Sequence, residues 1–351
     1  MKEMALVTGG TGLLGSHLLL GLAREHTEVL AVKRPSSDLE EVRKVFGYHT
    51  AGEDELEELF GRIRWIDADL LDQVEMEQVM RGAEGMQPVK QVYHCAAMVS
   101  FQPRDRMKMI RFNTDSTASV VHASLAAGVK RLLHVSSTSA IGRPPEGFPA
   151  IESMIWTPSK TSTGYARSKF QSEMEVWRAV EEGLSAVIVN PSIILGPGFW
   201  KRGSSSMFSQ VAGGLKYAAP GVTGYVGVQD VVRAMTWLMN SDISGERFIL
   251  SEGDYSYRQV FEMIARSLGN SRELKEVTPF LLGNLVRLDA FSSLFTRKRH
   301  ITSEHLLAAF GKVRFSSEKV KSALGMEFTP LQKVIEEVAQ HYRKDFPLKV
   351  A

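Results

Sequence analysis

Short apolar runs alternate with longer amphipathic runs along the first half of the chain. The apolar runs are rich in Val, Ile, Leu and Ala, which is typical of strands buried on both faces of a parallel sheet. The runs between them place apolar residues three and four apart, as helices do. The predicted strands lie at residues 5–7, 29–32, 63–70, 90–97, 132–135 and 186–189. This alternation predicts an α/β fold with a doubly wound parallel sheet over residues 1–195.

Two later parts of the chain depart from this order. Residues 38–60 contain two charged helical runs, which we interpret as a surface insertion. After Gly196 the alternation ends, and the pattern predicts a smaller, mainly helical lobe over residues 196–351, with residues 225–250 returning to the first domain. Because ligands of open α/β sheets bind at the carboxyl ends of the strands, we expect this lobe to cover that edge and bind substrate.

Three glycines follow the first strand at intervals of three residues. Gly9 permits a tight turn, Gly12 lets the backbone approach a pyrophosphate, and Gly15 lets the next helix pack closely on the sheet. Leu13 and Leu14 lie where that helix begins, and its first N–H groups face the anion. The turn predicts a Rossmann dinucleotide-binding domain in which these five residues contact the cofactor.

Lys33 and Arg34 end the second predicted strand, beside the adenosine ribose of any bound dinucleotide. An Asp or Glu would accept a hydrogen bond from the free 2′-hydroxyl, but none occurs here before Asp38. A guanidinium can instead hold a 2′-phosphate with two hydrogen bonds. The sequence therefore predicts NADP as the cofactor in preference to NAD.

Tyr165 and Lys169 are four residues apart in a helical run, so their side chains share one face. A nearby ammonium favours the phenolate and lowers the pKa of a tyrosine toward the range of acid–base catalysis. A hydroxyl at the end of the preceding strand could orient a carbonyl group, and Ser136, Ser137 and Thr138 are the candidates.

Composition narrows the class of protein further. The 351 residues carry a formal net charge of +2 without a long block of one sign, so we expect no nucleic-acid partner and interpret the basic cluster at 297–300 as solvated. No apolar run reaches the ~18 residues that span a bilayer, and the first strand begins too early for a signal peptide. The single cysteine, Cys95, fits a reducing compartment. We therefore expect a cytosolic protein without a membrane or metal site.

The order of these motifs resembles the extended short-chain dehydrogenase/reductase family, also described as NAD-dependent epimerases/dehydratases. The shared motifs are Thr8 to Gly15, Asp69-Leu70, His94 to Ala97, Ser136-Ser137, Tyr165 with Lys169, and Asn190 to Pro197. The resemblance implies that Tyr165 is the general acid/base and that Lys169 lowers its pKa and holds the nicotinamide ribose. It assigns the hydrogen bond to the reacting oxygen to Ser137, with Thr138 as the alternative.

The resemblance also implies further cofactor contacts. Asp69 and Leu70 are expected by the adenine. The other residues expected at the cofactor are Ala96, Ala97, Pro191 and Ser192. A homodimer through the helices near residues 104–127 and 164–182 is expected on the same ground.

Within this family the chain is similar to dihydroflavonol reductases and hydroxysteroid dehydrogenases. Lys33 and Arg34 favour NADP(H), and Thr138-Ser139 replaces the acidic pair of sugar 4,6-dehydratases. The apolar residues expected to line the substrate pocket are Met98, Val99, Phe101, Phe199, Trp200, Met207 and Phe208. We therefore expect an NADP-dependent oxidoreductase that interconverts a ketone or aldehyde with an alcohol on a mostly apolar small molecule.

Two other functions stay open at this point. A nucleotide-sugar epimerase or dehydratase would use the same site while its tightly bound dinucleotide is reduced and reoxidised within one turnover. A non-catalytic dinucleotide-binding sensor or scaffold is the other, and its usual mark is loss of the Tyr or the Lys. We also expect the loop 199–207 and the helical run 279–295 to move when substrate enters.

Overall fold

The computed structural model of the chain describes residues 3–25, 28–82, 87–159, 162–270, 273–277 and 309–347. The basic cluster at 297–300 and the helical run at 279–295 lie outside these ranges. Within the described ranges, no helix combines the length and the apolar character that crossing a membrane requires.

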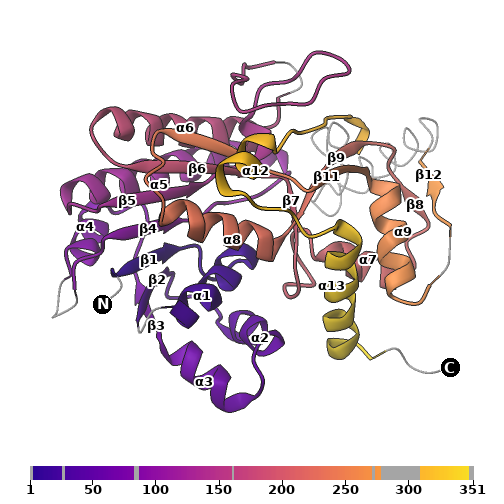
Figure 1. Cartoon of the computed structure of the whole chain (residues 1–351), viewed down its shortest axis with the longest axis horizontal. Helices are drawn as coiled ribbons and strands as arrows, with labels where there is room; N and C mark the ends of the chain where they lie inside the picture. The colour runs from indigo at the N-terminus through magenta and orange to yellow at the C-terminus, as the bar shows by residue number, and fades with distance from the viewer. Residues whose placement is uncertain are drawn as a thin grey trace.

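A seven-stranded parallel sheet forms the centre of the larger half of the molecule, in the order β10-β6-β5-β4-β1-β2-β3 (Figure 1). Its strands are β1 (Ala5–Thr8), β2 (Val29–Lys33), β3 (Ile63–Asp67), β4 (Gln91–His94), β5 (Arg131–Val135), β6 (Ala186–Pro191) and β10 (Glu246–Leu250). Chain order reverses at β1, which lies between β2 and β4, and this reversal is the point where doubly wound sheets bind ligands. The predicted Rossmann-type α/β fold is confirmed.

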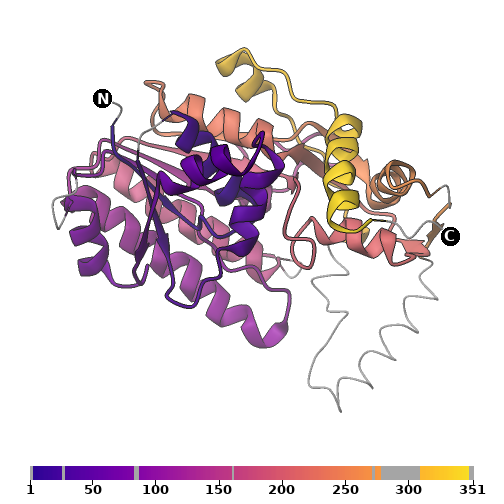
Figure 2. The ribbon, with the colours of Figure 1, turned by 90° about the horizontal axis from the view of Figure 1, so that it is seen from below.

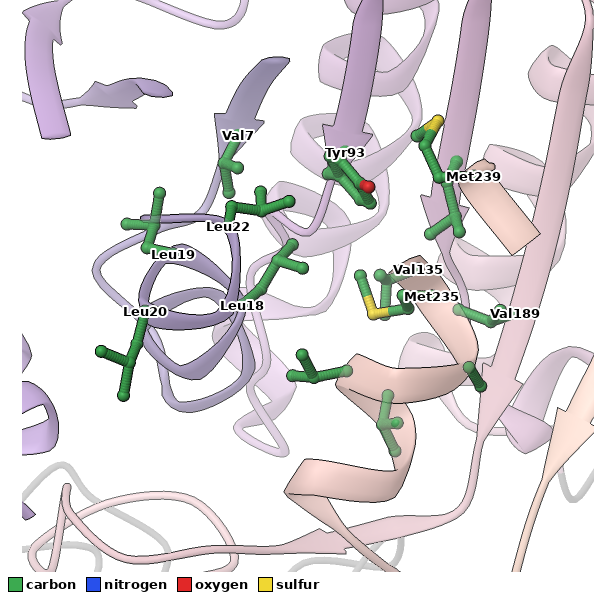
Figure 3. Close-up of a cluster of buried hydrophobic side chains, with 14 of the residues drawn as sticks. Val7, Leu18, Leu19, Leu20, Leu22, Tyr93, Val135, Val189, Met235 and Met239 are labelled. Atoms are coloured by element: carbon green, nitrogen blue, oxygen red, sulfur yellow. The ribbon is translucent and has the colours of Figure 1, made fainter. Parts of the chain in front are cut away.

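Helices cover both faces of this sheet because alternate strand residues point to opposite sides (Figure 2). Leu6 and Val92 face one layer of helices, whereas Val7 and Val135 face the other. The first layer contains α4 (Gln73–Arg81), α5 (Arg106–Ala126) and α6 (Gly164–Glu181). The second contains α1 (Leu13–Glu25) and α8 (Val228–Met239). Figure 3 shows the second layer, where Leu18 and Leu22 of α1 approach Val7 and Tyr93.

The interpretation of residues 38–60 as a surface insertion is wrong. These residues form α2 (Glu40–Tyr48) and α3 (Glu53–Gly61), which belong to the core packed against α1. Val42 and Phe46 of α2 and Leu56 and Leu59 of α3 are buried there. The charged residues lie on the opposite faces of both helices, which is why the segment has a surface-like composition.

The smaller half follows β6 directly. Its sheets consist of β7 (Ile193–Leu195) with β9 (Val222–Gly227) and β11 (Gly253–Ser256), and of β8 (Tyr217–Ala218) with β12 (Lys275–Glu276). Its helices are α7 (Ser206–Ala212), α9 (Tyr257–Ser267) and α13 (Leu331–Asp345), which lie together at one end of the molecule (Figure 1). Helix α12 (Glu318–Leu324) instead packs against β10 and α8. The hydrophobic pattern predicted the helices better than these short strands, most of which have too few residues for a clear alternation.

Part of the expected pocket wall is core instead. Trp200, Met207 and Phe208 are buried among α7, α9 and α13 and form one hydrophobic cluster with Tyr342. The Trp200 ring meets the Tyr342 ring edge-on, with centroids 5.1 Å apart. Phe199 is also buried, so the residues of the expected wall that keep exposed surface are Met98, Val99 and Phe101.

Candidate active site

The glycine turn is shaped by backbone contacts. Gly9 has φ +74°, and a Cβ there would lie 2.6 Å from the backbone nitrogen of Ala96. A Cβ on Gly15 would lie 2.2 Å from the carbonyl oxygen of Gly9. Both distances are far below van der Waals contact, so the fold itself requires glycine at these two positions.

Gly12 differs from its two neighbours. Its N–H donates to the Gly9 carbonyl at 3.1 Å, but a Cβ on it would meet only that oxygen, at 3.4 Å. The described fold therefore leaves room for a side chain at this position. A glycine here is explained by a ligand that approaches the backbone closely at the start of α1, beside Leu13 and Leu14. The turn fits the pyrophosphate of a dinucleotide.

Arg202 is a residue that the sequence analysis missed. Its guanidinium donates to the carbonyl of Thr11 in the glycine turn at 3.3 Å and lies 4.8 Å from the centroid of the Phe199 ring. The backbone of Phe199 is held at φ 56°, an uncommon conformation for a residue with a side chain. The segment after β7 thus brings a positive charge to the glycine turn, through a contact between residues 191 positions apart that no local pattern indicates.

The carboxyl ends of β2 and β3 form the adenosine side of the candidate site. Lys33 makes an ion pair with Asp67, its register partner on β3. Arg34 is exposed, and no ion pair holds it among the described residues. Asp69 follows β3 and accepts from the N–H of Leu71 at 3.0 Å, with Leu70 half-buried between them. Asp67 was not predicted, and it partly neutralises one of the two cations proposed for a 2′-phosphate.

Ala96 and Ala97 continue β4 toward the centre of the sheet edge. The N–H of Ala96 donates to the Thr8 hydroxyl at 3.3 Å. Buried Asn113 of α5 fixes the next residue, since it accepts from the Met98 N–H at 2.7 Å and donates to the Met98 carbonyl at 3.0 Å. Asn113 was not predicted because a lone amide in a helix of mixed polarity has no recognisable spacing. It ties the loop after β4 to α5.

Ser137 and Tyr165 meet at the carboxyl end of β5. Ser137 is the N-cap of a short turn, where its hydroxyl oxygen accepts from the N–H of Ser139 at 3.1 Å. Its side chain also lies close enough to Tyr165, near the start of α6, to lower the pKa of the Tyr165 hydroxyl. Thr138 is buried next to it and makes no such contact among the described residues. The geometry favours Ser137 over Thr138 as the partner of Tyr165.

Burial shifts the pKa values of both Tyr165 and Lys169. Burial raises the pKa of the Tyr165 hydroxyl, and the group that lowers this pKa is Ser137. The Lys169 ammonium donates to the Val135 carbonyl at the end of β5, at 2.8 Å. Burial lowers the pKa of Lys169 to about 8. The Lys169 ammonium therefore lies beside the candidate site with a pKa close to neutral pH.

A buried ion pair between Glu173 and Arg247 is connected to Ser137 through hydrogen bonds of Asn190. Glu173 of α6 is fully buried and accepts from Arg247 of β10 at 2.8 Å. The amide of Asn190 joins this pair to the site, because it donates to Glu173 at 2.6 Å and to the Ser137 carbonyl at 2.9 Å. Asn190 was part of a family motif, but Glu173 and Arg247 were not predicted. Three strands and one helix are thus connected under the candidate catalytic serine.

Pro191 and Ser192 complete the set at the carboxyl end of β6. Ser192 donates its N–H to the Leu250 carbonyl at 2.9 Å and links β6 to β7. The structure thus places every predicted site residue along one edge of the sheet. The two ends of this edge are the adenosine side at Lys33 and the catalytic side at Tyr165.

The protein combines a Rossmann sheet with a glycine turn at one end of the candidate site and with a Ser, a Tyr and a Lys at the other. This combination defines a short-chain dehydrogenase/reductase of the extended type. Residues 5–251 match the family described as NAD dependent epimerase/dehydratase family, and the chain belongs to it. It is an NAD(P)-dependent oxidoreductase, and the family binds this dinucleotide.

Three proteins to which the chain is similar can be compared with it. Sterol demethylase protein B of Methylococcus capsulatus is 28% identical over 285 residues, which cover 81% of this chain and 80% of that protein. A putative dihydroflavonol 4-reductase of Synechocystis is 32% identical over 197 residues, 56% of this chain and 51% of that protein. The crystal structure of gox2253 superposes with a TM-score of 0.77 at 25% identity, over 99% of this chain and all (100%) of that one.

Proposed function

We propose that the protein is an NADP-dependent reductase that interconverts a ketone or aldehyde with an alcohol on a mostly apolar small molecule. The observation that carries the proposal is the approach of Ser137 to Tyr165 at the carboxyl end of β5, close enough to lower the pKa of the Tyr165 hydroxyl, with Lys169 one helical turn further along α6. The similarity to a dihydroflavonol 4-reductase and to a sterol demethylase protein supports a ring-containing apolar substrate.

The roles of the side chains follow from their contacts. Ser137 donates a hydrogen bond to the substrate oxygen from its place beside Tyr165. Tyr165 gives its proton to that oxygen, and burial keeps it protonated until a negative charge develops there. Lys169 leaves the Val135 carbonyl to hold the nicotinamide ribose, and its charge then favours the phenolate. The dinucleotide supplies the hydride when it is bound.

The preference for NADP rests on Arg34. Its guanidinium is exposed at the end of β2 and free to form a two-pronged contact with a 2′-phosphate. The residues that hold the rest of the dinucleotide are the glycine turn, Asp69, Leu70, Ala96, Ala97, Pro191 and Ser192.

The experiment is an assay of NADPH and NADH oxidation against a panel of aromatic and alicyclic ketones and aldehydes. We expect net NADPH consumption with at least one of them and a 10²–10⁴-fold lower kcat in Tyr165→Phe, because general acid catalysis contributes about that factor. NADPH affinity, measured by fluorescence titration, should change little in this variant. An unimpaired Tyr165→Phe enzyme would contradict the catalytic assignment.

A nucleotide-sugar epimerase or dehydratase is the second candidate, since the family description includes both activities. Such an enzyme regenerates its dinucleotide in each turnover, so substrate conversion without net NADPH oxidation would favour it. A non-catalytic sensor is disfavoured because Tyr165 and Lys169 are both present. The homodimer through α5 and α6 and the cytosolic location stay predictions.

A further inference from the structure

Three side chains of metal-ligand type meet between α2 and α13, outside the candidate active site. They are His49, which ends α2, and Glu337 and His341 of α13. The donor atoms of these residues all lie within 4.8 Å of one another. Glu337 and His341 are four residues apart on a helix and therefore share one face. We propose that His49, Glu337 and His341 form a binding site for a divalent cation, for which Zn²⁺ is the best match.

The imidazole of His341 gives independent support. Only 8% of the residue is exposed, and its Nδ1 has no hydrogen-bond partner within the described part of the chain. A buried polar atom without a partner destabilises the folded chain, so a ligand that reaches it is favoured. A cation between the three side chains would give this buried ring the partner that it lacks.

The protonation states suit a cation. Burial lowers the pKa of His49 to about 4, and burial also lowers the pKa of His341. Both rings are therefore neutral at pH 7 and offer a lone pair without first losing a proton.

Two neutral histidines and one carboxylate are a set that zinc accepts in tetrahedral sites with a fourth position for water. The Gln229 side-chain amide lies beside His49, with its nitrogen 3.4 Å from His49 Nε2 and 3.2 Å from Nδ1 of His17. For His49 to bind the cation through Nδ1, this amide must turn its oxygen toward His49 and accept from the Nε2–H.

Bond lengths of 2.0–2.2 Å require donor atoms roughly 3.4 Å apart, so small side-chain rotations must bring these donors closer. Arg24 and Lys344 lower the pKa values of His49 and His341 by their positive charge, and both will weaken cation binding. Asp345 acts in the opposite direction on His341. These charges favour moderate affinity over the tightness of a closed structural zinc site.

A cation here would join the two halves of the molecule. His49 belongs to the layer of helices on the sheet, and α13 belongs to the smaller half, beside α7 and α9 (Figure 1). The rings of His49 and His341 already lie 5.6 Å apart between centroids. Since the ligands come from both halves, binding should raise the temperature at which the whole chain unfolds.

The test uses full-length protein treated with a chelator and dialysed, to which ZnCl₂ alone is added. Calorimetry should give one Zn²⁺ per chain, and the unfolding midpoint should rise with Zn²⁺. CoCl₂ should give the visible absorption of a tetrahedral site. Glu337→Gln, at an exposed position, should keep the fold by circular dichroism and bind at least about tenfold more weakly, and His341→Gln should abolish the cobalt spectrum.

His122→Gln is the matched control, because His122 lies on α5 beside Arg178 and outside the cluster. It should bind Zn²⁺ like the wild type. Absence of stoichiometric Zn²⁺ binding to the wild type would overturn the proposal. Unchanged binding in Glu337→Gln and His341→Gln would also overturn it, since the metal would then lie elsewhere in the chain.

Discussion

The glycine turn and the smaller half of the molecule are held in shape by different kinds of contact. In the turn, backbone atoms approach so closely that Gly9 and Gly15 have no room for a Cβ. In the smaller half, side chains from distant segments hold the shape, as when Trp200 donates to Asp345 of α13 at 2.7 Å. A local run of residues encodes the first arrangement, whereas the second depends on the folded chain as a whole.

This difference teaches where a single substitution should matter most. A backbone contact cannot relax when a methyl group is added, because no rotamer change removes the clash. A side-chain contact can be replaced in part by its neighbours or by water. We therefore expect the turn to be far less tolerant than the smaller half.

Gly15→Ala should have the largest effect. The new Cβ would lie 2.2 Å from the Gly9 carbonyl oxygen, so the turn and α1 must separate. We expect a loss of roughly 3 kcal/mol or more in the free energy of unfolding. NADPH binding should be undetectable at concentrations that saturate the wild type. Urea unfolding and fluorescence titration measure the two quantities.

Gly12→Ala is the matched substitution, and its Cβ has room in the described fold. Its free energy of unfolding should lie within about 1 kcal/mol of the wild-type value. It should nevertheless bind NADPH more weakly, because the methyl group occupies the position of the pyrophosphate. If both alanine variants lost stability equally, the turn would owe its glycines to the fold alone.

Acid should act mainly through the larger half, where His17 and His94 are buried. Burial lowers the pKa of each to about 3. The unfolded chain binds these protons below pH 6.5 and the folded chain does not, so stability falls as the pH drops from 6.5 toward 3. At pH 5 the loss is roughly 2 kcal/mol for each histidine. Equal urea midpoints at pH 7 and pH 5 would contradict this, and His94→Gln should flatten the dependence.

The same contrast explains what the sequence could predict. The sheet, the glycine turn and the positions of Tyr165 and Lys169 could be predicted from local patterns. Side chains repeat every two residues along a strand and about every 3.6 residues along a helix, so a short stretch of sequence shows which residues share a face. Asn113, Glu173, Arg202 and Arg247 were missed, since each acts across more than fifteen residues or between separate elements. The assignment of Trp200 to the pocket failed for a related reason, because an aromatic residue after a loop has no pattern that separates core from cleft.

Trp200→Phe tests the smaller half. It removes the hydrogen bond to Asp345 and keeps most of the ring packing against Tyr342. Hydrogen bonds to charged groups contribute about 1.5–3 kcal/mol, so we expect thermal unfolding to show a loss at the lower end of that range. NADPH affinity should stay within twofold, because the turn is untouched. A collapse of cofactor binding would show that the two regions are more strongly coupled than their contacts indicate.

Asp67→Asn should have the smallest effect. It tests a side-chain contact that lies in the larger half of the molecule, where the glycine turn is held by backbone contacts. Asp67 now pairs with Lys33 at the adenosine side, and its side chain is 54% exposed. Exposed pairs of this kind contribute about 0–1 kcal/mol, so stability should hardly change. The freed Lys33 ammonium would join Arg34 in facing the 2′-phosphate, and NADPH affinity should rise a few-fold while NADH affinity does not. Arg34→Ala, compared in the same titration at fixed ionic strength, should lower NADPH affinity alone. If Asp67→Asn instead weakened NADH and left NADPH unchanged, Asp67 would be the acceptor for a free 2′-hydroxyl, and NAD rather than NADP would be the cofactor that this edge of the sheet selects.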